Sequence, residues 1–216
     1  MKHIAVDFAE TLVKERPMVQ WVLYEIRNTQ KSLWRRLTFM INSFSRGPVS
    51  IAFGKYSKTS QWAAQVAYKA FKGLDEKDLR EFINYKINNG YILNLNEDLL
   101  FVIDKLRENN RSVNVSIHSQ GTCSKAIELF LQREDVINRL EKSGISITHI
   151  VANRMKIQNG KFTGSIIPPV ITKHTKHLTL PQNCIFIGDD RDEKALMRLE
   201  DKPFQFINHT KWLLNQ

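Results

Sequence analysis

Short apolar runs alternate with longer stretches of helical periodicity along this chain. Five runs have the length and the β-branched or aromatic content of strands, namely residues 3–8, 112–118, 147–152, 183–187 and 203–207. Strands separated by helices favour a parallel sheet, because each crossover helix packs back onto a face of the sheet. The pattern therefore predicts an α/β fold whose functional residues gather at the carboxyl edge of the strands.

Residues 16–91 differ from the rest of the chain, because their pattern is helical and strand signals are sparse. Asp75 has the position of a helix N-cap, with Leu74 and Leu79 placed as a hydrophobic staple. The same helix is predicted to bury an apolar stripe formed by Leu79, Phe82, Ile83 and Ile87. We interpret this segment as an inserted helical cap.

The remaining residues, 1–15 and 92–216, are predicted to form a discontinuous α/β core around the insert. Asn96 is expected to cap the first helix after the insert, because an amide side chain there can accept a hydrogen bond from the first turn. Residues 155–166 are predicted to form a β-hairpin that turns at Asn159-Gly160, a pair suited to a two-residue turn with positive φ.

The net charge of +10 is the main compositional signal, since 42% hydrophobic and 25% charged residues are ordinary for a globular protein. A basic protein favours encounter with anions, which include phosphorylated metabolites, nucleic acid and acidic membrane faces. No nucleic-acid recognition motif accompanies the charge, so we expect no nucleic-acid partner. No sequence feature predicts an oligomeric state.

The N-terminal residues and the cysteines bear on the cellular compartment. The first strand contains Asp7, and no apolar run there is long enough for a signal peptide or a membrane span. Cys123 and Cys184 lie far apart and match no metal-ligand spacing. We therefore expect a cytoplasmic protein without disulfides or a zinc site.

Asp7 and Asp189 each stand at the end of a predicted core strand. Parallel pairing of these strands would bring both carboxylates to one edge of the sheet. Two carboxylates form an oxygen-rich site that suits Mg²⁺, with water and a substrate phosphate completing the coordination shell. A carboxylate can also attack phosphorus and form an aspartyl-phosphate. The pair therefore predicts a nucleophile beside a Mg²⁺ site.

Two motifs at these positions resemble a known family. Residues 6–12, Val-Asp-Phe-Ala-Glu-Thr-Leu, resemble the first motif of the haloacid dehalogenase superfamily, and residues 187–193, Ile-Gly-Asp-Asp-Arg-Asp-Glu, resemble its fourth. Residues 70–74 and 159–164 look like the phosphoserine-phosphatase-like branch. The resemblance implies a Rossmann-like parallel sheet flanked by helices, with an α-helical cap inserted after the first strand and a small β-hairpin.

The same resemblance implies a Mg²⁺-dependent phosphatase that acts on a small phosphorylated molecule through an aspartyl-phosphate. Asp7 would be the nucleophile and a metal ligand. Asp189 would be the second carboxylate ligand, and Ala9 would offer its backbone carbonyl to the metal. Ser119, just after the second predicted strand, would hydrogen-bond the phosphoryl group.

The family's lysine, which neutralises the phosphate and the nucleophile together, would be Lys173, with Lys176 as a substitute. The segment between Lys173 and Asp189 is shorter than the family usually has, so both lysines stay open. A phosphate-binding or outer-shell role would fall to Thr11, Gln120, Asp190 and Glu193.

Ala9 departs from the family's phosphatases, which place a general-acid aspartate two residues after the nucleophile. Losing such an acid typically costs about a hundredfold to ten-thousandfold in rate, so a weakened phosphatase is expected. Two alternatives stay open. One is an impaired relative that binds phosphate or a partner. The other is carbon–phosphorus cleavage of the phosphonoacetaldehyde-hydrolase type, whose members also have alanine there and recruit a cap lysine.

Residues 31–46 mix large apolar side chains with lysine and arginine. A basic amphipathic helix of this kind could lie on an anionic membrane face. The favoured interpretation is a cap helix that packs on the core with its basic side in water.

Overall fold

The computed structural model describes residues 3–28, 31–88, 95–107, 112–196 and 204–214. Its centre is a five-stranded sheet with the order β3-β2-β1-β6-β7, in which every neighbouring pair is parallel. The strands are β1 (Ile4–Val6), β2 (Val113–Ser119), β3 (Ile145–Ala152), β6 (Cys184–Gly188) and β7 (Phe204–Asn208). The predicted α/β fold with a parallel sheet is confirmed.

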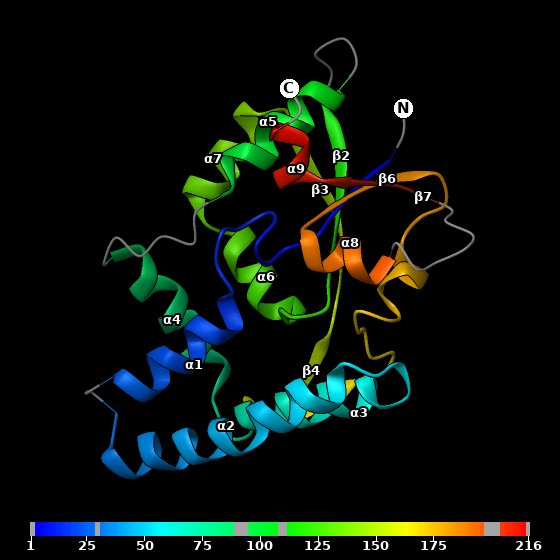
Figure 1. Ribbon diagram of the computed structural model, residues 1–216. Helices are drawn as coiled ribbons and strands as arrows, with labels where there is room; N and C mark the ends of the chain where they lie inside the picture. Colours follow the sequence, from blue (N-terminus) through cyan, green and yellow to red (C-terminus); the bar gives the residue numbers. More distant parts are fainter. Residues whose placement is uncertain (1–2, 29–30, 89–94, 108–111, 197–203, 215–216) are drawn as a thin grey trace.

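Helices cover this sheet and form a separate layer away from it (Figure 1). The helices that follow strands or precede β2 are α5 (Glu97–Leu106), α6 (Ser124–Leu131), α7 (Glu134–Lys142), α8 (Asp190–Leu196) and α9 (His209–Leu214). The segment between β1 and α5 holds α1 (Pro17–Arg27), α2 (Leu33–Gly54), α3 (Ser57–Tyr68), the 3₁₀ turn η1 (Lys69–Phe71) and α4 (Glu76–Asn88). We call α1 to α4 the helical insert. In Figure 1, α2 and α3 lie at the opposite end of the molecule from α5 and α9.

The local predictions hold where the structure describes them. The hairpin consists of β4 (Arg154–Gln158) and β5 (Lys161–Ile167), and both turn residues, Asn159 and Gly160, have positive φ. Asn96 caps α5 by accepting a hydrogen bond from the Asp98 N–H at 3.3 Å. The end of the predicted cap, at residues 91 and 92, and the side chain of Ile87 lie outside the described residues.

The staple before α4 is present, and Asp75 directly precedes the helix, at the predicted N-cap position. Leu74 and Leu79 are both buried, as predicted. The Asp75 N–H donates a hydrogen bond to Asp78 Oδ2 at 2.8 Å. Asp78 therefore has the role of the third helical residue of a capping box, whose side chain accepts from the N–H of the N-cap residue. The same carboxylate also contacts Lys31 and Arg35.

Two large apolar clusters support the two layers. The first joins the sheet with α5, α6 and α7, and includes Val6, Leu99 and Ile187. The second joins the helical insert, α6 and the β4–β5 hairpin, and includes Trp21, Phe71 and Phe162. Trp21 stacks on Phe71 with a centroid distance of 4.8 Å and meets Phe162 edge to face at 5.7 Å. The hairpin is therefore part of the packing of the insert, which fixes the insert over the sheet.

The inner side of α2 packs on the insert through Phe39, which is 5% exposed. Arg35 and Arg36 also point inward, to Asp78 and to the Ile26 carbonyl. Most of the other large apolar side chains of α2 are exposed, which corrects the expectation that the apolar side packs and the basic side is solvated. These residues form what we call the outer face of α2, namely Leu33, Trp34, Leu37, Ile41, Phe44 and Ile51.

Among the helices of the described residues, none is both long enough and apolar enough to cross a bilayer.

Candidate active site

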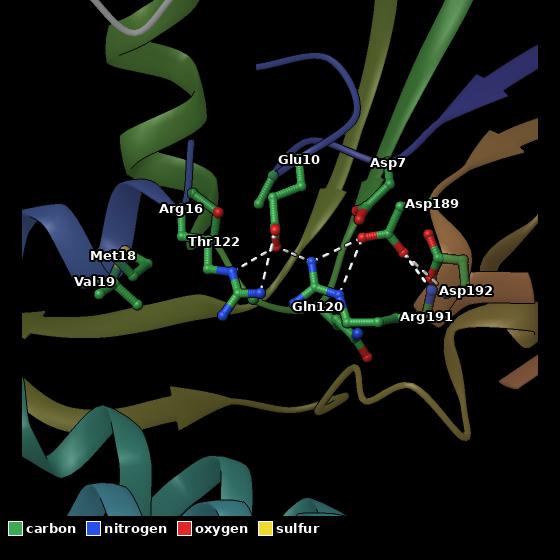
Figure 2. Close-up of a pocket in the computed structure, with 12 residues that line it drawn as sticks. Asp7, Glu10, Arg16, Met18, Val19, Gln120, Thr122, Asp189, Arg191 and Asp192 are labelled. Carbon is green, nitrogen blue, oxygen red and sulfur yellow. Dashed lines mark hydrogen bonds and ion pairs between the residues drawn. The ribbon is translucent and has the colours of Figure 1, made fainter. Parts of the chain in front are cut away.

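Asp7 and Asp189 meet at the carboxyl edge of the sheet, as predicted. Val6 in β1 is level with Ile187 in β6, and the Asp7 N–H donates to the Ile187 carbonyl at 3.0 Å. Asp189 follows directly after β6. Both aspartates line one pocket of about 140 Å³, which Figure 2 shows between the strand ends and the start of α1.

A buried lysine contacts Asp7. The Lys176 Nζ lies 2.9 Å from Asp7 Oδ1 and 3.0 Å from each carboxylate oxygen of Asp192. All three residues are buried, with at most 6% of each residue exposed. Burial raises the pKa of Asp7 to about 7, with the Lys176 ammonium opposing the shift and the Asp192 carboxylate adding to it. We call Asp7, Lys176 and Asp192 the buried charge triad.

The structure thus places Lys176, which the sequence offered as the substitute, beside Asp7, and it does not place Lys173 there. The Thr172 carbonyl accepts hydrogen bonds from the N–H groups of Thr175 and Lys176, which closes a turn. The 3₁₀ turn η2 (Lys176–Thr179) follows, and the Lys176 side chain points into the core. Lys173 instead lines a neighbouring pocket of about 270 Å³ between α2, α3 and the β2–α6 loop. Lys173 and Lys176 are only three residues apart, so their spacing to Asp189 could not distinguish them. The turn that follows Thr172 does.

Asp192 was not among the predicted site residues. It lies three residues after Asp189 in the first turn of α8, and its N–H donates to Asp189 Oδ1 at 3.0 Å. A Cβ at Gly188 would lie 2.6 Å from Asp192 Oδ2, so the close approach of Asp192 requires glycine there. The spacing Asp189 to Asp192 was the available signal, because residues three apart share a helix face.

Asp190 and Glu193, the predicted outer-shell residues, face away from the pocket. The Asn208 side-chain amide donates to Asp190 Oδ1 at 2.7 Å and to Glu193 Oε2 at 3.0 Å. Glu193 is also ion-paired with Lys211 of α9. These contacts tie α8 to β7 and α9, and neither side chain is among the residues that line the pocket, so an outer-shell role for them stays a prediction.

Arginines bridge the acidic residues at the mouth of the pocket (Figure 2). Arg191 donates to Asp189 Oδ2 from Nε at 3.0 Å and from Nη2 at 2.8 Å, and it is also ion-paired with Glu10. Glu10 in turn accepts from Arg16 Nε at 2.5 Å. Burial alone would raise the pKa of Asp189, but the hydrogen bonds from Arg191 lower it overall. We call the Asp189–Arg191–Glu10 contact the guanidinium bridge.

The other predicted residues lie near the pocket but differ in access. Ala9 and Gln120 line it. Ser119 is fully buried, and its Oγ accepts a hydrogen bond from the Thr122 N–H at 3.3 Å, so it shapes the Gln120–Thr122 loop from behind. Thr11 is fully buried in the turn after β1 and is not among the residues that line the pocket.

A chain of hydrogen bonds explains the polar residues of β2. The His118 ring bonds Ser116 Oγ through Nε2 at 2.8 Å and Thr179 Oγ1 through Nδ1 at 2.9 Å. Thr179 Oγ1 donates to the Lys176 carbonyl at 2.7 Å. His118 thus braces the turn that carries Lys176. Burial lowers the pKa of His118 to about 4, and the Lys176 charge adds to the shift.

The donor set at the strand ends suits a hard cation. The carboxylates of Asp7 and Asp189 and the backbone of Ala9 line the same pocket and offer only oxygen ligands, which Mg²⁺ prefers. The described residues contain no group of three or more His, Cys, Asp or Glu side chains arranged for a metal. Water and a phosphate group would therefore have to complete the shell, as is usual for Mg²⁺.

No family model matches this sequence, and no curated protein does either. Solved structures do share its fold. Cytosolic 5'-nucleotidase IIIB bound to cytidine aligns with 99% of this chain and 75% of its own, at 12% identity and a TM-score of 0.58. A substrate-bound phosphoserine phosphatase aligns with 91% of this chain and 81% of its own, at 17% identity and a TM-score of 0.52. An HAD family hydrolase from Salmonella enterica serovar Typhi aligns with 90% of this chain and 58% of its own, at 16% identity and a TM-score of 0.54.

Proposed function

Because the chain has the fold of the haloacid dehalogenase-like hydrolases, we propose that it is a Mg²⁺-dependent phosphatase-type hydrolase acting through Asp7 on a small phosphorylated molecule. The observation that carries this proposal is that Asp7, which lines a pocket together with Asp189, is ion-paired from behind with the buried Lys176. A buried carboxylate next to a buried ammonium can approach an anionic phosphate without the full charge repulsion.

In the proposed reaction an Asp7 carboxylate oxygen attacks the phosphorus atom and the bond to the leaving oxygen breaks. Water then attacks the aspartyl-phosphate, which releases phosphate and restores the carboxylate. Lys176 remains close to Asp7 throughout and offsets the negative charge of the transferring group. Asp192 keeps Lys176 in place, because its two oxygens each lie 3.0 Å from the same ammonium. Mg²⁺, held by Asp7, Asp189 and the Ala9 carbonyl, would shield the phosphate charge.

The phosphoryl group would lie against the Gln120–Thr122 loop, whose residues line the pocket opposite Asp7. Ser119 acts indirectly in this proposal, because its Oγ holds the Thr122 N–H. The neighbouring pocket shares Gln120 and Gly121 with the catalytic one. The part of the substrate beyond the phosphate could therefore extend toward α2 and α3, where Lys173 lies.

Position 9, where the family's phosphatases have the aspartate that protonates the leaving group, is alanine in this chain. Besides the three aspartates, the pocket has the acidic side chain of Glu10, which is paired with both Arg16 and Arg191. We therefore expect good leaving groups to react faster than alkoxides, for which general acid catalysis is worth about a hundredfold or more.

The second candidate is a relative that binds phosphate or a partner without turnover. Two observations favour it: Ala9 lacks an acid, and the Arg191 guanidinium already occupies Asp189. Carbon–phosphorus cleavage has less support, because no lysine is among the described residues that line the catalytic pocket.

The test is hydrolysis of p-nitrophenyl phosphate and acetyl phosphate with Mg²⁺. We expect turnover by the wild type and a loss of at least about a hundredfold in Asp7→Asn. Asp190→Asn is the matched control, because this carboxylate is exposed and faces α9, and it should retain activity. Turnover that survives in Asp7→Asn contradicts the mechanism. A folded wild type that binds phosphate but turns over nothing in a broad phosphate ester panel supports the second candidate.

A further inference from the structure

The outer face of α2 presents large apolar side chains to solvent. Their exposed fractions include 81% for Trp34, 68% for Phe44 and 70% for Ile51. A soluble surface normally scatters such residues singly, whereas a contiguous apolar patch marks an interaction site. The outer face of α2 is therefore a candidate interaction site.

The periodicity of the face shows that it is one stripe along the helix. Leu33, Leu37, Ile41, Phe44 and Ile51 are spaced by three, four or seven residues, which places them along one side of a 3.6-residue helix. The opposite side carries the buried Phe39 and the inward arginines. The helix thus packs by one side and leaves an apolar side outward.

The segment of sequence that carries this stripe contains charges of a single sign. Residues 26–74 contain nine lysines and arginines and no aspartate or glutamate. Arg27, Lys55, Lys58, Lys69 and Lys72 are exposed. Tyr56 and Trp62, just past the end of α2, are 66% and 51% exposed, and such amphipathic rings favour the headgroup region of a bilayer.

We propose that the outer face of α2 docks the protein on the surface of a bilayer that contains anionic phospholipids. The apolar stripe would enter the interface while the surrounding lysines meet lipid phosphates, the combination that holds amphipathic helices on membranes. A second copy of this chain is a poorer occupant, because it would bring two faces of the same positive charge together.

Docking through this face bears on the active site. The inner side of α2 contributes Ser50 and Gly54 to the pocket beside the catalytic one. A protein held by the outer side of α2 would therefore keep this second pocket close to the bilayer. The proposed docking itself needs no catalytic activity, so it can fail or hold independently of the proposed function.

Co-sedimentation of the full chain with vesicles tests the proposal. We expect binding to vesicles of phosphatidylcholine mixed with phosphatidylglycerol, little binding to phosphatidylcholine alone, and weaker binding at high salt. The double variant Trp34→Ser, Phe44→Ser should bind at least about tenfold more weakly with an unchanged melting temperature, since both side chains are exposed. Phe101→Ser is the matched control, because Phe101 is 45% exposed on α5 in the other layer, and it should bind like the wild type.

Three results would overturn the proposal. One is a wild type that stays in the supernatant with anionic vesicles at low salt. Another is equal loss of binding in Phe101→Ser and in the double variant, which would show that the stripe is not the contact. The third is a stable dimer in light scattering that only the double variant disrupts, without vesicle binding, which would assign the face to a second copy.

Discussion

The Lys176 ammonium lies 2.9 Å from Asp7 Oδ1, although the two residues come from opposite ends of the chain. Asp7 directly follows the central strand β1, and Lys176 begins the turn η2 shortly before β6. The contact therefore exists only when β1 is inserted between β2 and β6. It joins the folding of the discontinuous core to the chemistry of the site.

Replacing Lys176 should harm both stability and turnover. Lys176→Met leaves Asp7 and Asp192 buried next to each other without a cation, and breaking a buried ion pair in this way costs about 3 to 5 kcal/mol in the free energy of unfolding. Turnover should fall by at least about a hundredfold. Lys173→Met should lower neither by a comparable amount, and urea unfolding with steady-state kinetics checks both. Equal effects of the two substitutions would contradict the assignment of Lys176.

Removing the guanidinium bridge should strengthen Mg²⁺ binding. Arg191 donates two hydrogen bonds to the carboxylate that would hold the metal, so Arg191→Ala frees Asp189. We expect the dissociation constant for Mg²⁺ to fall by about threefold to tenfold in isothermal titration calorimetry, because a competing cation of the protein is lost. Lys211→Ala, on the α9 side, is the control and should leave the constant unchanged. Weaker binding in Arg191→Ala would show that the bridge supports the metal site instead.

Acid should destabilise the protein through His118. Its pKa is lowered to about 4 in the folded state from an ordinary 6.5, so the unfolded chain binds the extra proton between these values. The stabilisation is complete above pH 6.5 and is lost as the pH falls toward 4, on the order of 3 kcal/mol in all. Urea unfolding at several pH values should show a shallower acid loss in His118→Gln than in the wild type. Parallel curves for both proteins would contradict this.

The insert depends on a buried charge cluster. Asp78 accepts from Lys31 Nζ and from Arg35 Nη2, each at 2.6 Å, and is 2% exposed. Asp78→Ala should lower the free energy of unfolding by about 3 kcal/mol, because it leaves the Lys31 ammonium only the longer contacts to Glu25 at 3.3 Å and to Glu81 at 3.9 Å. Glu81→Ala is the matched control, since the Glu81 side chain is 55% exposed and 3.9 Å from Lys31, and it should cost less than about 0.5 kcal/mol.

Restoring an acid at position 9 should change the leaving-group dependence. Ala9 lines the catalytic pocket, so Ala9→Asp places a carboxyl group beside Asp7. If the proposed function holds, turnover of alkyl phosphates should rise by about tenfold or more, and turnover of p-nitrophenyl phosphate should change little. Ala9→Asn has the same shape without the acid and should not show the gain.

Much of the fold and part of the site followed from local sequence pattern. The strand runs, the Asn159-Gly160 turn and the Asn96 cap depend on backbone preferences of near neighbours, and each appears where it was predicted. The two strand-end aspartates also followed, because parallel strands must share one carboxyl edge.

Tertiary structure alone decided which charged side chains lie around Asp7. Lys176 rather than Lys173, and Asp192 rather than Asp190 or Glu193, point inward because of where a turn and a helix begin. A shift of one residue rotates a helical side chain by about 100°, which local pattern does not fix to that accuracy. The outward apolar face of α2 was hidden for a related reason: periodicity identifies an apolar stripe, but only packing shows whether another part of the chain covers it.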